Sequence, residues 1–62
     1  MTREQVKQII IEEINEMKSH KHTQEFVEYN ANGMVKAFKR VGILEQDDIM
    51  ITELLDEGIF EV

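Results

Sequence analysis

The sequence predicts an all-α protein, a small three-helix bundle with helices at about 2–20, 23–41 and 46–57 followed by a short apolar tail. Three observations support this fold class. Proline is absent, and only three glycines occur among many strong helix formers. Apolar residues recur with helical spacing in each segment. Residues that commonly cap helices stand where these apolar patterns begin. The chain is long enough for one domain, residues 1–62.

The first helix begins at a predicted capping box. Thr2 is the expected N-cap, and Gln5 follows three residues later, where its side chain can bind the Thr2 backbone. The run "IIIEEI" resembles a strand only briefly, because the helical spacing continues for three turns. The apolar residues of this helix face are Val6, Ile10, Ile14 and Met17, with Ile9 alongside.

The second helix has an unusual centre, because Asn32–Gly33 is a strong turn signal. Thr23 is the expected N-cap, and the apolar face keeps its helical phase from Phe26 to Val41 without slipping at the glycine. We therefore expect one continuous helix, with a kink at Asn32–Gly33 as the alternative. Glycine weakens a helix by about 1 kcal/mol. We expect Gly33 to be tolerated because it lets the first helix approach closely.

The third helix is predicted to start at Glu45. With Glu45 as N-cap, Asp48 takes the third helical position, and Leu44 can pack against Ile49 as a hydrophobic staple. Aspartates in the first turn also favour the positive end of the helix dipole. A helix over about 46–57 follows from this arrangement.

Glycines are predicted to end the last two helices. Gly42 follows the basic last turn of the second helix, and Gly58 follows the third, each as the residue after the C-cap. In a Schellman arrangement, Ile59 would then contact Leu54. The apolar tail "IFEV" is expected to pack on the bundle or on a second subunit.

The apolar residues exceed what a bundle of this size is expected to bury. The predicted core consists of Val6, Ile10, Ile14, Met17, Phe26, Met34, Phe38, Val41, Ile51, Leu54 and Leu55. Among the apolar residues that this core leaves unassigned are Ile11, Val35, Met50, Ile59, Phe60 and Val62. Such a surplus suggests a further buried surface, most simply that of a homodimer.

The net charge of −6 comes from the last third of the chain. Residues 1–22 are balanced, whereas residues 43–62 contain seven acids and no base. An acidic helix beside apolar residues can steer a basic partner surface towards it. The alternative is a solvated face whose acids partly meet Lys36, Lys39 and Arg40. The predicted partner-binding residues are Asp47, Asp48, Met50, Glu53, Asp56, Glu57, Ile59 and Phe60, with Met50 and Phe60 exposed.

Few residues suggest catalysis or metal binding. Glu16 and His20 share a helix face, but His22 would have to fold back to complete a zinc site. Glu13 lies inside the apolar arc, where it either sits at the rim or pairs with a base of the second helix. The chain has no cysteine and no Gly-rich phosphate loop. We therefore predict no catalytic, cofactor-binding or metal site.

The sequence therefore favours a small interaction protein, a regulator or inhibitor that presents an acidic helix to a basic partner. The alternative is a structural, self-associating helical module. Direct nucleic-acid binding is disfavoured, because phosphates would repel the acids of the third helix. No apolar run has the roughly 18 residues of a membrane span, and no signal-peptide core is evident. We expect a cytoplasmic protein without a membrane anchor.

Overall fold

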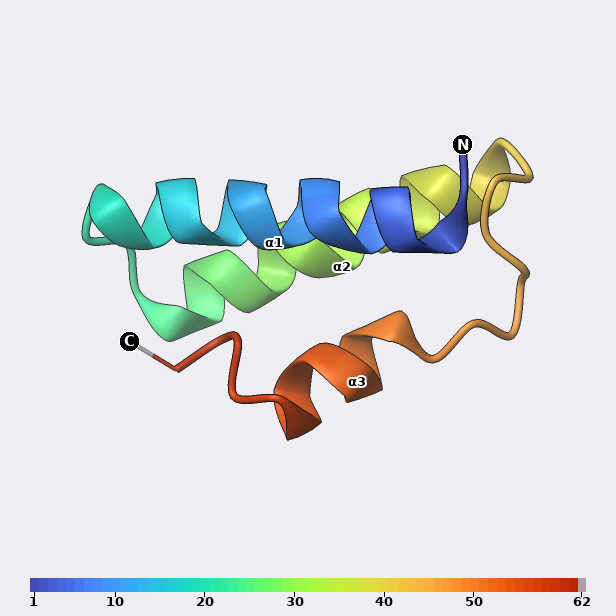
Figure 1. The fold of residues 1–62 in the computed structure, drawn as a ribbon. Coiled ribbons are helices and arrows are strands. Elements are labelled where there is room, and N and C mark those ends of the chain that lie inside the picture. The colour runs from blue at the N-terminus through green and yellow to red at the C-terminus, as the bar shows by residue number, and fades with distance from the viewer. Residues whose placement is uncertain (62) are drawn as a thin grey trace.

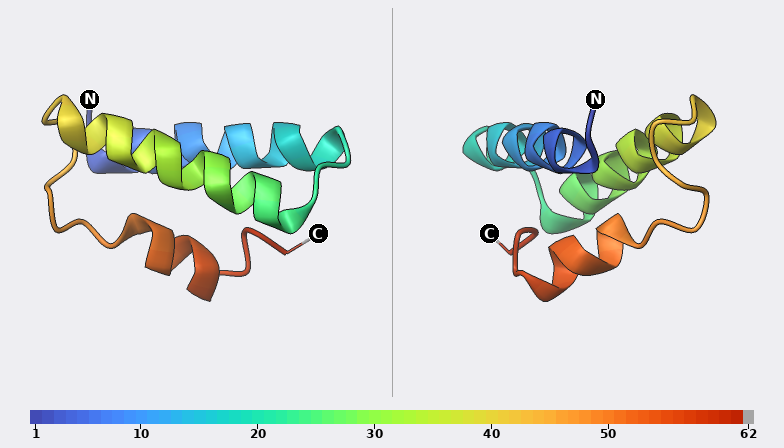
Figure 2. Two further views of the ribbon diagram at one scale, coloured as in Figure 1. Left: turned by 180° about the vertical axis from the view of Figure 1, so that it is seen from behind. Right: turned by 45° about the vertical axis from the view of Figure 1, so that its right-hand side comes forward.

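The computed structural model describes residues 1–61 and contains three helices, α1 (Arg3–Ser19), α2 (Gln24–Arg40) and α3 (Met50–Asp56). Helices α1 and α2 run antiparallel, side by side, and after a long connection α3 lies along one side of this pair and runs back in the direction opposite to α2 (Figures 1 and 2). The tail returns towards the α1–α2 turn. The all-α three-helix prediction is confirmed. Within residues 1–61, no helix is long and apolar enough to cross a membrane.

The predicted caps of the first two helices are present. The Thr2 hydroxyl accepts a hydrogen bond from the Gln5 backbone at 3.1 Å, and the Gln5 side chain accepts one from the Thr2 backbone at 2.8 Å. The Thr23 hydroxyl accepts a hydrogen bond from the Phe26 backbone at 3.2 Å. These bonds satisfy N–H groups that the first helical turn leaves free. Local sequence therefore sets where both helices begin.

Helix α2 is continuous through Gly33, as predicted, but the predicted reason is wrong. Gly33 is exposed, and a Cβ atom added there would meet no atom within 4 Å. It therefore does not bring α1 and α2 together. The buried residues of α2 are Val27, Ala31 and Val35, on the opposite side of the helix.

All three helices end with the Schellman pattern, in which the residue after the C-cap has a positive φ. In α3, the Ile59 N–H donates to the Leu54 carbonyl at 3.0 Å, as predicted. The residues with positive φ are Lys21 (63°), Gly42 (81°) and Gly58 (71°). Lys21 adopts this conformation without the freedom of glycine, so the turn between α1 and α2 carries backbone strain.

Helix α3 begins later than predicted. Its first residue is Met50, its N-cap is Ile49, and that cap has no side-chain hydrogen bond. Asp48 instead binds Arg3 of α1, and Leu44 is buried in the core while Ile49 is exposed. The expected Leu44–Ile49 staple is therefore not formed. Long-range contacts take the residues that a local cap would have used.

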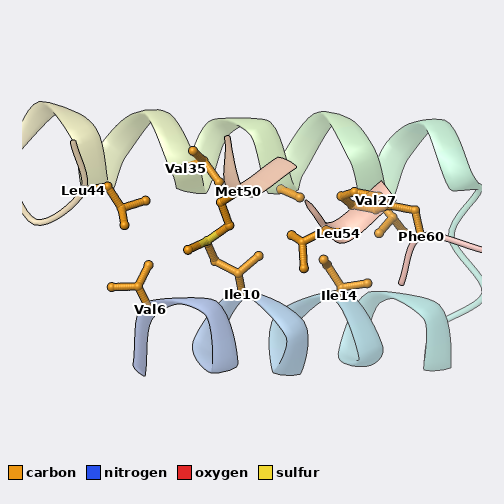
Figure 3. Close-up of a cluster of buried hydrophobic side chains, with 10 residues drawn as sticks. Val6, Ile10, Ile14, Val27, Val35, Leu44, Met50, Leu54 and Phe60 are labelled. Carbon is orange, nitrogen blue, oxygen red and sulfur yellow. The ribbon is translucent and has the colours of Figure 1, made fainter. Parts of the chain in front are cut away.

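The core lies between α1 and α2 and is closed by α3 and the tail (Figure 3). Its buried residues are Val6, Ile10, Ile14, Val27, Ala31, Val35, Leu44, Met50, Leu54 and Phe60. Four further predicted core residues, Met17, Met34, Phe38 and Ile51, are partly buried against this cluster. Three others, Phe26, Val41 and Leu55, are exposed, so that part of the prediction is wrong.

A single copy of the chain also buries much of the apolar surplus, the residues that the sequence analysis left outside the predicted core. Val35, Met50 and Phe60 belong to the core, and Ile11 and Ile59 pack partly against it. The last member of the predicted surplus, Val62, lies outside the described residues. The composition argument for a homodimer is correspondingly weaker, and the dimer itself stays a prediction.

Candidate functional site

The acidic last third of the chain, the predicted contact surface, is partly neutralised by α1. Arg3 forms two hydrogen bonds of 2.8 Å with the Asp48 carboxylate and another of 2.8 Å with Glu53. Lys7 binds Glu57 at 2.7 Å and approaches Glu53 at 3.5 Å. Three of the seven acids of residues 43–62 therefore face α1 and fasten α3 to it.

The pKa values of this network follow from these contacts. Hydrogen bonds from Arg3, more than its charge, lower the pKa of the Asp48 and Glu53 carboxyls. The same bonds raise the pKa of the Arg3 guanidinium. The bond to Glu57 is the main reason that the pKa of Lys7 is raised. These shifts all favour the charged form of the group concerned.

The basic end of α2 does not take the role that the sequence suggested. Lys36, Lys39 and Arg40 form no ion pair with the acids of residues 43–61. Together with Gln46, which donates a hydrogen bond of 2.7 Å to the Lys39 carbonyl, they line a hollow of about 430 Å³. The acids pair instead with bases near the N-terminus, more than forty positions away in the chain.

Four of the seven acids of residues 43–61 form no ion pair within the described residues, namely Glu45, Asp47, Asp56 and Glu61. Asp47 and Asp56 are exposed and take part in no ion pair within residues 1–61. The apolar component of the contact surface differs from the prediction. Met50 and Phe60 are buried, so their expected exposure is wrong, and Ile59 packs partly against the core.

Two apolar residues that the prediction did not assign to this surface are exposed instead. Ile49 is 62% exposed and Leu55 is 48% exposed. The sequence does not distinguish the buried pair from the exposed one, because Met50 and Leu54 have the same four-residue spacing as Ile51 and Leu55. Both pairs can form the buried side of a helix, and in the folded chain Met50 and Leu54 are the pair packed into the core. We use the name α3 outer face for five exposed residues, of which Asp47 and Ile49 precede the helix and Thr52, Leu55 and Asp56 lie within it.

The other candidate groups are accounted for by surface contacts. His20 and Glu16 approach to 3.1 Å, as their spacing predicts, but the His22 ring stacks on Phe26 with centroids 4.0 Å apart. Within residues 1–61, no three His, Cys, Asp or Glu side chains are placed to share a metal ion. Glu13 is exposed, in agreement with the rim alternative.

The charge and shape of the α3 outer face are therefore the main evidence on function. The chain matches no protein-family model, and no curated protein or solved structure is similar to it.

Proposed function

We propose that the protein is a small intracellular interaction module whose α3 outer face binds a basic surface of another protein. The observation that carries this proposal is the exposure of Ile49 and Leu55 beside the unpaired carboxylates of Asp47 and Asp56. Apolar contacts supply most of the affinity of such an interface. Acidic groups around them accelerate encounter with a positively charged partner and exclude acidic ones.

The ion pairs beneath this surface support the same proposal. Arg3 and Lys7 attach the α1-facing side of α3 to the bundle, so the outer face is held in place before binding. A preorganised surface loses less conformational entropy when it binds. A module of this size would act by occupying a basic surface that its partner needs for another ligand, as a regulator or inhibitor does.

The test compares two variants of equal net charge. Asp47→Asn/Asp56→Asn removes two charges from the α3 outer face, and Glu12→Gln/Glu13→Gln removes two exposed charges from α1. Proteins captured from a cell lysate are quantified for each variant and for the wild type. We expect the α3 variant to lose specific partners that the α1 variant keeps.

A second variant separates the apolar contribution from the electrostatic one. Leu55→Ser should weaken capture of the same partners while leaving the sensitivity to salt unchanged, because it removes contact area and no charge. Partners retained by both α3 variants would contradict the proposal. Circular dichroism of each variant confirms that the fold is intact before binding is compared.

A further inference from the structure

The outward side of α2 carries a stripe of exposed residues that nothing in the described chain covers. Its members lie on one line along the helix, three and four residues apart, directly opposite the buried Val27, Ala31 and Val35. They are Phe26, Tyr29, Gly33, Lys36 and Arg40, and all are exposed. No other element of residues 1–61 lies over this side of α2 (Figure 2). We call these five residues the α2 stripe.

The α2 stripe has two aromatic side chains that a single chain leaves open. Tyr29 is 81% exposed and Phe26 is 43% exposed, with one ring face of Phe26 covered by His22. Gly33 lies between these aromatics and the basic residues, and it weakens the helix without any packing role inside the chain. Tyr29, Asn32, Gly33 and Lys36 line a hollow of about 400 Å³.

Charge along α2 is separated into two halves on either side of Gly33. Glu25 and Glu28 precede it, and Lys36, Lys39 and Arg40 follow it. None of these five side chains forms an ion pair within residues 1–61. A helix with this distribution is complementary to a second copy of itself running in the opposite direction, and it repels a parallel copy.

We propose that two copies of the chain pair through antiparallel α2 helices that cross at Gly33. The positions of the α2 stripe fit this symmetry, because Phe26 and Arg40 are each seven residues from Gly33. Each Arg40 then lies over the open ring face of the other copy's Phe26, and each Lys36 lies beside the other copy's Tyr29. Both are cation–π contacts. Each contact occurs twice, as two-fold symmetry requires.

Gly33 has a specific role in this pairing. At the crossing point the two glycines face each other, so the helix backbones approach closely and the flanking aromatics reach across. The pairing uses a different surface from the α3 outer face. The proposed dimer and the proposed function can therefore be disproved independently of each other. The Asp47→Asn/Asp56→Asn variant is therefore expected to dimerise normally.

The first test is sedimentation equilibrium of the wild-type chain and two glutamate variants. Gly33→Glu places two like charges at the crossing point, whereas Asn15→Glu adds the same charge at an exposed position of α1, outside the α2 stripe. We expect a wild-type dimer whose dissociation constant rises on the order of 100-fold in Gly33→Glu and changes little in Asn15→Glu. A monomeric wild type, or equal effects of both variants, would overturn the proposal.

The second test uses complementary charge variants. Glu25→Lys/Glu28→Lys gives an α2 with only basic charges, and Lys36→Glu/Arg40→Glu gives one in which acids outnumber bases. Each variant alone should be monomeric where the wild type is dimeric, and an equimolar mixture should form a heterodimer. A mixture that stays monomeric would contradict pairing through α2, as would either variant dimerising alone as tightly as the wild type.

The third test determines the direction of pairing, and it is simple because the chain has no cysteine. In an antiparallel pair crossing at Gly33, position 29 of one copy lies near position 37 of the other. Tyr29→Cys mixed with Ala37→Cys should therefore form the mixed disulfide faster than either variant crosslinks with itself. Preferential self-crosslinking of both variants would show a parallel pair and overturn the proposal.

Discussion

Two surfaces of this small protein are rich in charge but use it differently. Between α1 and α3, Arg3 and Lys7 contact carboxylates of the last third at 2.7–3.5 Å. Along α2, acids and bases occupy opposite halves of one helix and form no ion pair within residues 1–61. Opposite charges are thus satisfied inside the chain only where a neighbouring element brings them together. The α2 charges form no such contact, although the charge of Lys39 contributes to lowering the pKa of the Asp48 carboxyl.

The largest expected difference in stability is between two phenylalanines, one in the core closed by α3 and the tail and one on the outward side of α2. Phe60 closes the core below α1 and is 1% exposed, whereas Phe26 belongs to the α2 stripe. Phe60→Ala should lower the free energy of unfolding by about 3–5 kcal/mol through lost burial and a cavity. Phe26→Ala should lower it by less than about 1 kcal/mol. Urea denaturation followed by circular dichroism, at concentrations where the chain is monomeric, measures both, and similar losses would contradict the assigned core.

Two matched arginines provide the next comparison. Arg3→Met removes a guanidinium with three hydrogen bonds to carboxylates, and Arg40→Met removes one with no ion pair in residues 1–61. Because the Arg3 side chain is 37% exposed, solvent screening limits its contribution, and we expect a loss of about 1 kcal/mol. Arg40→Met should change the free energy of unfolding by less than about 0.5 kcal/mol. Equal effects would show that the α1–α3 ion pairs do not stabilise the fold.

The pH dependence of stability should separate the same two arginines. Since the pKa values of Asp48 and Glu53 are lowered in the folded state, both carboxylates stabilise the fold above their ordinary pKa values. That stabilisation decreases as the pH falls from the ordinary carboxyl range through the folded-state pKa values. Unfolding measured from neutral to acidic pH should therefore show a shallower decrease in Arg3→Met than in Arg40→Met. Parallel curves would contradict the role assigned to Arg3.

The smallest expected effect concerns Gly33 in the monomer. Because a Cβ there would meet no atom within 4 Å, Gly33→Ala should stabilise α2 by its helix propensity alone, about 0.5–1 kcal/mol. Thermal unfolding of dilute protein measures this gain. If Gly33→Ala instead destabilised the protein, the result would support the original prediction that α1 packs closely against Gly33.

Much of the fold could be predicted because it depends on local chemistry. The Thr2 and Thr23 caps, the glycines after α2 and α3, and the continuity of α2 are all determined by residues within a few positions of each other. Of the predicted contact surface, Asp47 and Asp56 are exposed, whereas Met50 and Phe60, which were expected to be exposed, are buried. The binding role of this segment stays a prediction.

The incorrect predictions of burial share one physical cause. Where two helix faces are both apolar, the sequence does not determine which one is buried, and packing against other elements decides it. Val35 and Met50 are buried while Val41 and Leu55 are exposed, although each is apolar and each belongs to a helical pattern. Near the start of α3, Asp48 binds Arg3 forty-five positions away, and a hydrogen bond from the Met50 backbone also lowers the pKa of its carboxyl.

The sequence by itself determined the all-α class, two of the three helix starts, the helix ends at Gly42 and Gly58, and the concentration of acids in the last third. Tertiary structure alone decided which acids are neutralised and which apolar side chains remain exposed. The reason is that hydrogen-bonded caps and helical phase act over a few residues. The ion pairs of α1 with α3, and the burial of Met50 and Phe60, depend on segments that only the folded chain brings together.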